Sequence, residues 1–105
     1  MSAVAEKTAI DAVPTQLFIG GEWRDASSGK TLDIEDPSTG ETLTAVADAT
    51  PEDAKAALDA CCAVQDEWSR HPPRERAEIL RRSYQAMMDN VEDLALLMTL
   101  EMGKP

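Results

Sequence analysis

The sequence predicts a mixed α and β chain in which β-hairpins, over about residues 17–48, are followed by three helices, over about 51–68, 74–89 and 91–102. Two observations carry this prediction. In the first half, short β-prone runs are separated by turns that contain glycine or proline. In the second half, apolar residues recur at steps of three and four, with helix start and stop signals between the runs.

The composition is that of a folded protein with an acidic surface. Hydrophobic residues make up 43% and charged residues 29% of the 105 positions, which is too apolar for a disordered chain. The formal net charge is -10, because 20 acidic residues outnumber 10 basic ones. An anionic chain repels phosphate backbones and anionic lipid surfaces, so we expect neither a nucleic acid nor a membrane partner.

The N-terminus and the cysteines favour a cytoplasmic location. The first residues lack the basic start and apolar core of a secretory signal, and no apolar run approaches the ~20 residues of a membrane span. Two adjacent cysteines without an export signal are typical of a reduced, cytoplasmic protein. Residues 1–15 are small, polar and rich in alanine, and we expect them to form a flexible tail.

Turn signals organise the hairpin region. The Gly20-Gly21 pair lies between two β-prone runs and predicts a two-residue turn, because primed turns need a positive φ at both central residues. Residues 31–35 alternate between apolar and polar side chains, as in a strand. Residues 36–40 (DPSTG) predict a turn, and residues 42–46 read as the returning strand.

The first helix has clear signals at both ends. Thr50 is a good N-cap, Pro51 suits the first helical position, and two acidic residues follow. The helix is expected to end at His71, because the residue before a proline is pushed out of the α region. Its stripe of small and apolar residues is expected to be buried: Ala54, Leu58, Cys61, Val64 or Gln65, and Trp68.

The second helix, from about Arg74 to Asn90, has an apolar stripe and a charged face. On the charged face Glu78 is expected to pair at i,i+4 with Arg74 and Arg82. The apolar stripe is expected to be buried and consists of Ala77, Leu80, Tyr84, Met87 and Val91.

The third helix is apolar on nearly all sides. Asn90 is expected to cap its start, and Gly103 to end it in the left-handed conformation. A helix that is apolar all round is normally covered on more than one side, so we expect part of its cover to come from outside these 105 residues. Its large apolar residues are Leu94, Leu96, Leu97, Met98, Leu100 and Met102.

We predict no catalytic, cofactor-binding or metal-ligating residue in this chain. Cys61 and Cys62 lie in the middle of a helix with no histidine nearby, which favours a structural role over that of a nucleophile. His71 is the only histidine, and no Cys-x-x-Cys accompanies it, so the spacing of a metal site is missing.

Two further patterns could indicate ligand sites. A cluster of arginines could bind an anion, but acidic residues lie among them, so a solvated helix face is the favoured interpretation. These arginines are Arg70, Arg74, Arg76, Arg81 and Arg82. The five glycines form neither G-x-G-x-x-G nor a P-loop, so no phosphate-binding loop is predicted.

Four segments resemble, in order, the beginning of the aldehyde dehydrogenases. Residues 17–23 (LFIGGEW) resemble the family's opening strand-turn-strand, and residues 36–41 (DPSTGE) its Asn/Asp-Pro-x-x-Gly-Glu turn. Residues 54–68 resemble its alanine-rich helix that ends in Trp, and residues 98–105 (MTLEMGKP) the end of its third helix. Each segment alone is weakly specific, whereas four in the right order are strongly specific. The first and last are most similar to the succinate-semialdehyde dehydrogenase branch.

The resemblance implies an enzyme that oxidises a small aldehyde, here succinate semialdehyde, to the acid with NAD or NADP, and that forms homo-oligomers. In that family a cysteine thiolate attacks the aldehyde, a hydride passes to the nicotinamide, and a glutamate acts as base. The resemblance makes residues 16–105 the first part of the family's cofactor domain. None of the family's catalytic or nucleotide-contacting residues matches a position here, so we expect an inactive N-terminal fragment.

The alternative is a stand-alone helical interaction module that binds a partner through residues 94–102. Both hypotheses explain why this helix is apolar all round. A coding sequence that continues past Pro105 into a Rossmann-like pattern would favour the enzyme, and a stop codon there would favour the module.

Overall fold

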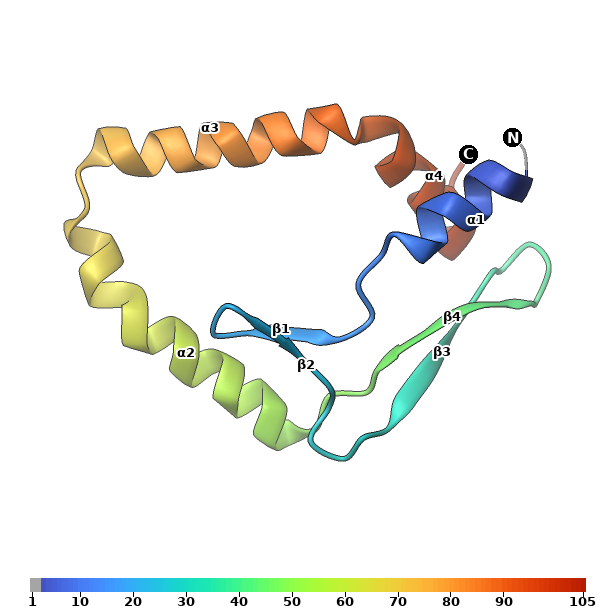
Figure 1. Ribbon diagram of the computed structural model, residues 1–105, viewed down its shortest axis with the longest axis horizontal. Helices are drawn as coiled ribbons and strands as arrows, with labels where there is room; N and C mark the ends of the chain where they lie inside the picture. Colours follow the sequence, from blue (N-terminus) through green and yellow to red (C-terminus); the bar gives the residue numbers. More distant parts are fainter. Residues whose placement is uncertain (1–2) are drawn as a thin grey trace.

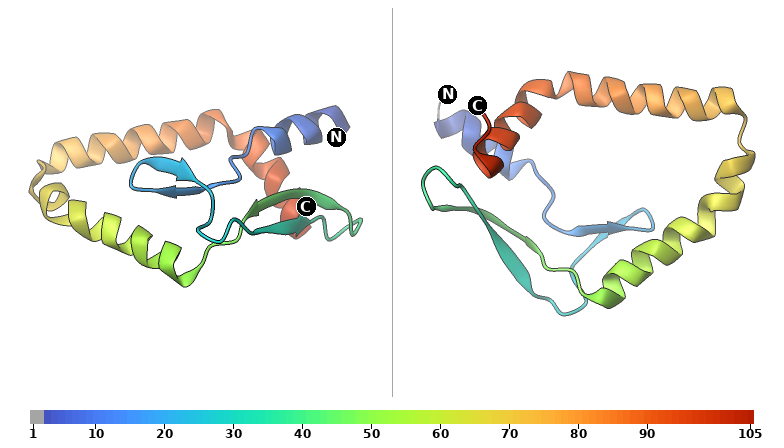
Figure 2. Two further views of the ribbon diagram at one scale, coloured as in Figure 1. Left: turned by 60° about the horizontal axis from the view of Figure 1, so that its bottom comes forward. Right: turned by 180° about the vertical axis from the view of Figure 1, so that it is seen from behind.

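The computed structural model describes residues 3–105, and the chain follows an open ring (Figure 1). Two long helices form one side and two hairpins the other, and the same ring is visible from the two further directions in Figure 2. The Cα radius of gyration is 17.0 Å, against about 13 Å for a compact chain of this length. The elements are α1 (Ala3–Asp11), β1 (Leu17–Ile19), β2 (Glu22–Arg24), β3 (Thr31–Glu35), β4 (Thr42–Ala47), α2 (Pro51–Arg70), α3 (Pro73–Asp89) and α4 (Val91–Met102).

The two predicted hairpins are present as separate two-stranded antiparallel sheets, β1-β2 and β3-β4. The turn between β1 and β2 has positive φ at Gly20 (61°) and Gly21 (83°), which confirms the predicted primed turn. Phe18 lies opposite Trp23 in this hairpin, and their ring centroids are 4.8 Å apart. In the second hairpin the register shifts between Ile34 and Glu35, next to the predicted turn.

The predicted start and end of α2 are confirmed. The Thr50 side chain accepts a hydrogen bond from the backbone N–H of Asp53, whose side chain accepts one from the N–H of Thr50. This reciprocal capping box satisfies two N–H groups that would otherwise lack a partner. At the other end His71 is already extended, with φ -62° and ψ 140°, as expected of a residue before a proline.

The boundary between α3 and α4 corrects one predicted cap. Asn90 does precede α4, but its side chain makes no bond to the start of that helix. Instead its amide donates to the carbonyl of Ala86 at 2.8 Å and so caps the end of α3. The carbonyl groups at the end of a helix need such donors as much as the next helix's N–H groups need acceptors. Gly103 ends α4 with φ 74°, as predicted.

The expected flexible tail over residues 1–15 contains a helix in the structure. Residues 3–11 form α1, and Ala9 on it is 3% exposed. The segment is rich in good helix formers, and α1 packs against α4. Packing onto an apolar partner is what makes so short a helix stable. The first two residues of the expected tail lie outside the described residues.

The core of the ring is small and lies where α1 meets α4. Leu96 and Leu100 are each 7% exposed and pack with Ala9, while Ile10, Leu43 and Leu97 pack around them. The other large apolar side chains of α4 remain open, since Leu94, Met98 and Met102 are 38%, 57% and 70% exposed. Within the ring, therefore, α4 is covered on one side.

The two helical stripes that were expected to be buried are exposed. On α2, Leu58 and Val64 are 62% and 57% exposed, and on α3 no residue is buried. The side of α2 that faces the first hairpin carries Ala57 and Ala60 instead, which are half-buried. Periodicity correctly separated apolar from charged faces, but it could not show that no element among residues 3–105 covers the apolar faces.

Candidate functional site

The most enclosed polar side chain belongs to Asp53, which is 4% exposed. Its carboxylate accepts hydrogen bonds from the backbone N–H groups of Thr50 (2.9 Å) and Ser27 (3.0 Å). The hydroxyl groups of Ser27 and Thr50 lie 2.7 Å apart beside it. Backbone donation from Thr50, and next from Ser27, lowers the pKa of this carboxyl group. The ionised Asp53 carboxylate therefore connects the loop before β3 to the start of α2 by hydrogen bonds. This is a structural role.

The sequence signal for this cluster was partial. The Thr50-x-x-Asp53 spacing indicates a capping box, although Asp takes the position where Glu or Gln is usual. Ser27 lies 26 residues earlier, and no local pattern joins it to Asp53.

A second enclosed carboxylate, that of Asp36, organises the turn between β3 and β4. It is 8% exposed and accepts hydrogen bonds from the hydroxyl and the backbone N–H of Ser38 at 2.7 and 2.8 Å. The Ser38 hydroxyl is the main reason that the pKa of Asp36 is lowered. The backbone N–H of Gly40 closes the turn on the Asp36 carbonyl at 2.8 Å. The Asp36 carboxylate therefore also has a structural role.

Both cysteines are exposed on α2 and not on a buried face as the spacing of Cys61 had suggested. The reason is the one that exposes the whole stripe: no described element covers that side of the helix. Thiolate nucleophiles depend on a nearby base, cation or helix N-terminus. Cys61 and Cys62 lie mid-helix in α2, and among residues 3–105 neither thiol makes a hydrogen bond. The arrangement supplies no activated nucleophile.

His71 takes part in ending α2. Its Nδ1 lies 3.1 Å from the Glu67 carbonyl oxygen, and its ring centroid is 5.6 Å from that of Trp68. Within the described part of the chain, no group of three or more His, Cys, Asp or Glu side chains could hold a metal ion.

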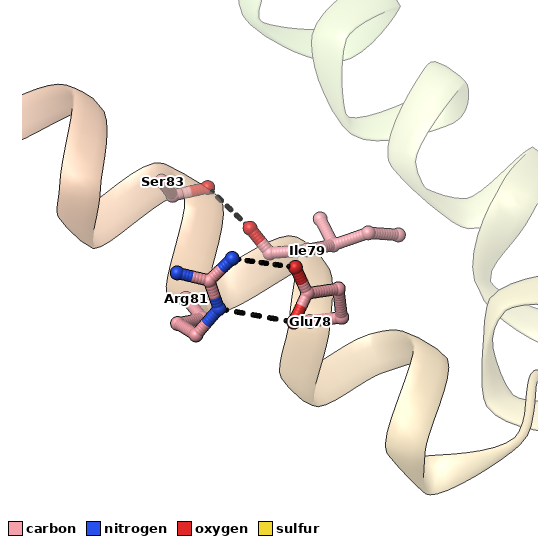
Figure 3. Close-up of polar contacts among 4 residues, drawn as sticks. All are labelled: Glu78, Ile79, Arg81 and Ser83. Atoms are coloured by element: carbon pink, nitrogen blue, oxygen red, sulfur yellow. Dashed lines mark hydrogen bonds and ion pairs between the residues drawn. The ribbon is translucent and has the colours of Figure 1, made fainter.

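The arginine cluster does not form a single solvated face, since Arg70 ends α2 and the half-buried Arg76 on α3 has an enclosed Nε without a hydrogen-bond partner in the described residues. The ion pairing on α3 also differs from the prediction. Arg81 donates to Glu78 from two nitrogens, at 2.7 and 3.0 Å, so the ion pair spans three residues and not four (Figure 3). The side chain of Arg81 is 61% exposed and that of Glu78 is 50% exposed. The guanidinium group of Arg81 forms two parallel hydrogen bonds with the carboxylate of Glu78. The predicted i,i+4 partners, Arg74 and Arg82, do not form such a pair of bonds here. The Arg81 hydrogen bond is the main reason that the pKa of Glu78 is lowered.

A groove of about 270 Å³ extends the small core between α1, the second hairpin and α4. Its lining is almost entirely aliphatic, and Glu101 is its single charged residue. Ligand sites usually combine an apolar lining with several convergent polar groups. This groove lacks such groups, so it offers no chemistry of its own.

The residues present do not fit a dinucleotide. A phosphate cradle needs glycines that open onto a free helix N-terminus. The glycines of this chain have positive φ values in turns and at the end of α4, and the start of α2 is occupied by its own capping box. Separately, no helix among residues 3–105 is both long and apolar enough to cross a membrane.

Comparison with known proteins gives the chain a clear set of relatives. The model of the aldehyde dehydrogenase family matches residues 23–105. The NADP-dependent succinate-semialdehyde dehydrogenase of Escherichia coli is 41% identical over 90 residues, which are 86% of this chain. The succinate-semialdehyde dehydrogenase of Paenarthrobacter nicotinovorans is 60% identical over 63 residues, which are 60% of this chain and 14% of the relative. The phenylacetaldehyde dehydrogenase of Pseudomonas fluorescens is 43% identical over 100 residues, which are 91% of this chain and 20% of the relative.

The structural comparison agrees with the sequence comparison. The crystal structure of an NADP-dependent enzyme of Escherichia coli superposes with a TM-score of 0.84 at 41% identity, over 87% of this chain and 19% of that one. The chain spans about a fifth of the length of the relatives it matches, with 19% for the Escherichia coli succinate-semialdehyde dehydrogenase.

Proposed function

Because the chain belongs to the aldehyde dehydrogenase family, we propose that it is the N-terminal part of an NAD(P)-dependent enzyme that oxidises an aldehyde to a carboxylic acid. The observation that carries this proposal is the family match over residues 23–105, which includes every element from α2 onward and most of the hairpin region. The chemistry is proposed for the longer enzyme and not for these residues alone.

We propose succinate semialdehyde as the aldehyde. The support is the 60% identity to one succinate-semialdehyde dehydrogenase and the 41% identity to another. The 43% identity to a phenylacetaldehyde dehydrogenase makes that aldehyde the natural competitor in a test.

In this proposal the residues described above supply scaffolding. Asp53 fixes the start of α2 to the preceding loop, and Gly20-Gly21 shapes the first hairpin. The nucleophile, the base and the loops that contact NAD or NADP are contributed by residues outside this chain. We further propose that the whole enzyme is a cytoplasmic homo-oligomer and that these 105 residues alone are inactive.

The interaction-module alternative receives less support from the structure. It requires residues 94–102 to be available to a partner. Leu96 and Leu100, at the centre of that segment, are already buried against α1. A partner could reach only the side of α4 that carries Leu94 and Met98.

The test of the proposed function uses the protein encoded by the complete reading frame. Purified protein is mixed with NAD⁺ or NADP⁺ and either succinate semialdehyde or phenylacetaldehyde, and reduced cofactor is followed at its absorbance band. We expect kcat/KM to be at least tenfold higher for succinate semialdehyde. Equal or reversed values would refute the substrate proposal, and no cofactor reduction with any aldehyde would refute the enzyme proposal.

A further inference from the structure

We draw no further inference here: the strongest candidate, the side-chain cluster of His71, Arg74 and Arg82 at the start of α3, carries nothing because two glutamates line the same pocket and no second observation among residues 3–105 points to an anionic ligand there.

Discussion

At Gly21 the backbone alone sets which residues are allowed. Its φ of 83° is one that L side chains rarely adopt, and a Cβ built there would meet no atom within 4 Å. The test uses a chimera in which this chain replaces the 90-residue segment that it matches in the Escherichia coli succinate-semialdehyde dehydrogenase. In the chimera, Gly21→Val should lower stability more than Gly21→Asn does, because Asn tolerates the left-handed region and a β-branched residue does not. The expected difference is about 1–2 kcal/mol, measured by urea unfolding. Since the site has room for either side chain, equal stabilities would mean that the turn is not a primed one in solution.

Asp53 predicts a specific dependence on pH. Hydrogen bonds to its carboxylate lower the folded-state pKa below its ordinary value. A lowered pKa means that the stabilisation is fully present above about pH 4 and is lost as the pH falls through the folded-state pKa. Asp53→Asn removes the charge at every pH. The gap in melting midpoint between the original chimera and the Asp53→Asn chimera should therefore be wide at pH 6–7 and should narrow towards pH 3.

The control for this prediction is Asp33→Asn, which removes one carboxylate from an exposed position of β3. It should give a small gap at every pH in this range. A gap for Asp53→Asn that stays constant from pH 7 to pH 3 would show that the carboxylate's charge contributes nothing to holding Ser27 and Thr50.

The exposed cysteines predict a result for the proposed enzyme. Replacing Cys61 and Cys62 by Ser in the protein from the complete reading frame should leave the hydride-transfer rate within about tenfold, because neither thiol has an activating partner. Stability should fall by about 1–2 kcal/mol if this side of α2 is packed there. Single-turnover measurement of cofactor reduction tests the rate. A loss beyond a hundredfold in a variant that is still folded would assign one of these thiols to the chemistry.

Among the elements, α2 depends most on the residue before its start. Thr50→Ala removes the side-chain acceptor for the Asp53 N–H and the contact with the Ser27 hydroxyl. Loss of a threonine N-cap costs about 1 kcal/mol, so the urea midpoint of the chimera should fall measurably. Thr50→Ser keeps the hydroxyl and should retain most of the stability. If the Thr50→Ser and Thr50→Ala chimeras have the same urea midpoint, the side-chain cap does not stabilise α2.

Element boundaries could be predicted because their signals are local. The Gly20-Gly21 pair, the Thr50-Pro51 start and the prolines after His71 each act within a few residues. The structure places the two hairpins and α2 to α4 within about two residues of the expected bounds. The predictions that failed were those that depended on tertiary contacts. The α1 helix was missed, because it is short and depends on packing against α4.

The candidate site shows the same division between local and distant information. Thr50 could be recognised from the sequence as the N-cap of α2, since cap signals are local. The contact between Ser27 and Asp53 could not, because it joins a loop to a helix start 26 residues away. The stripes on α2 and α3 were correctly identified as apolar, but their burial depends on a surface that periodicity does not describe.

For the molecule as a whole, the open ring sets the limit on independent stability. A small domain is stable by only about 5–15 kcal/mol, which remains after large opposing terms cancel. Leu94, Met98 and Met102 are 38%, 57% and 70% exposed, and covering these exposed parts would contribute roughly 2–5 kcal/mol. The uncovered part of α4 alone therefore approaches the lower end of a typical domain's stability, before the exposed apolar side chains of α2 and α3 are considered.

The 105-residue chain expressed alone should consequently lack a sharp unfolding transition, should self-associate and should reduce no cofactor. Its unfolding in urea should be broad, because contacts among α2, α3 and the hairpins are too few to make the ring one cooperative unit. Urea unfolding, sizing, and absorbance with succinate semialdehyde and either cofactor test the three parts, with the chimera as the folded control. A monomer with a steep transition would show that the ring is stable without its cover. Cofactor reduction above the level of a blank would place catalytic residues among these 105, against the exposed, unactivated state of Cys61 and Cys62.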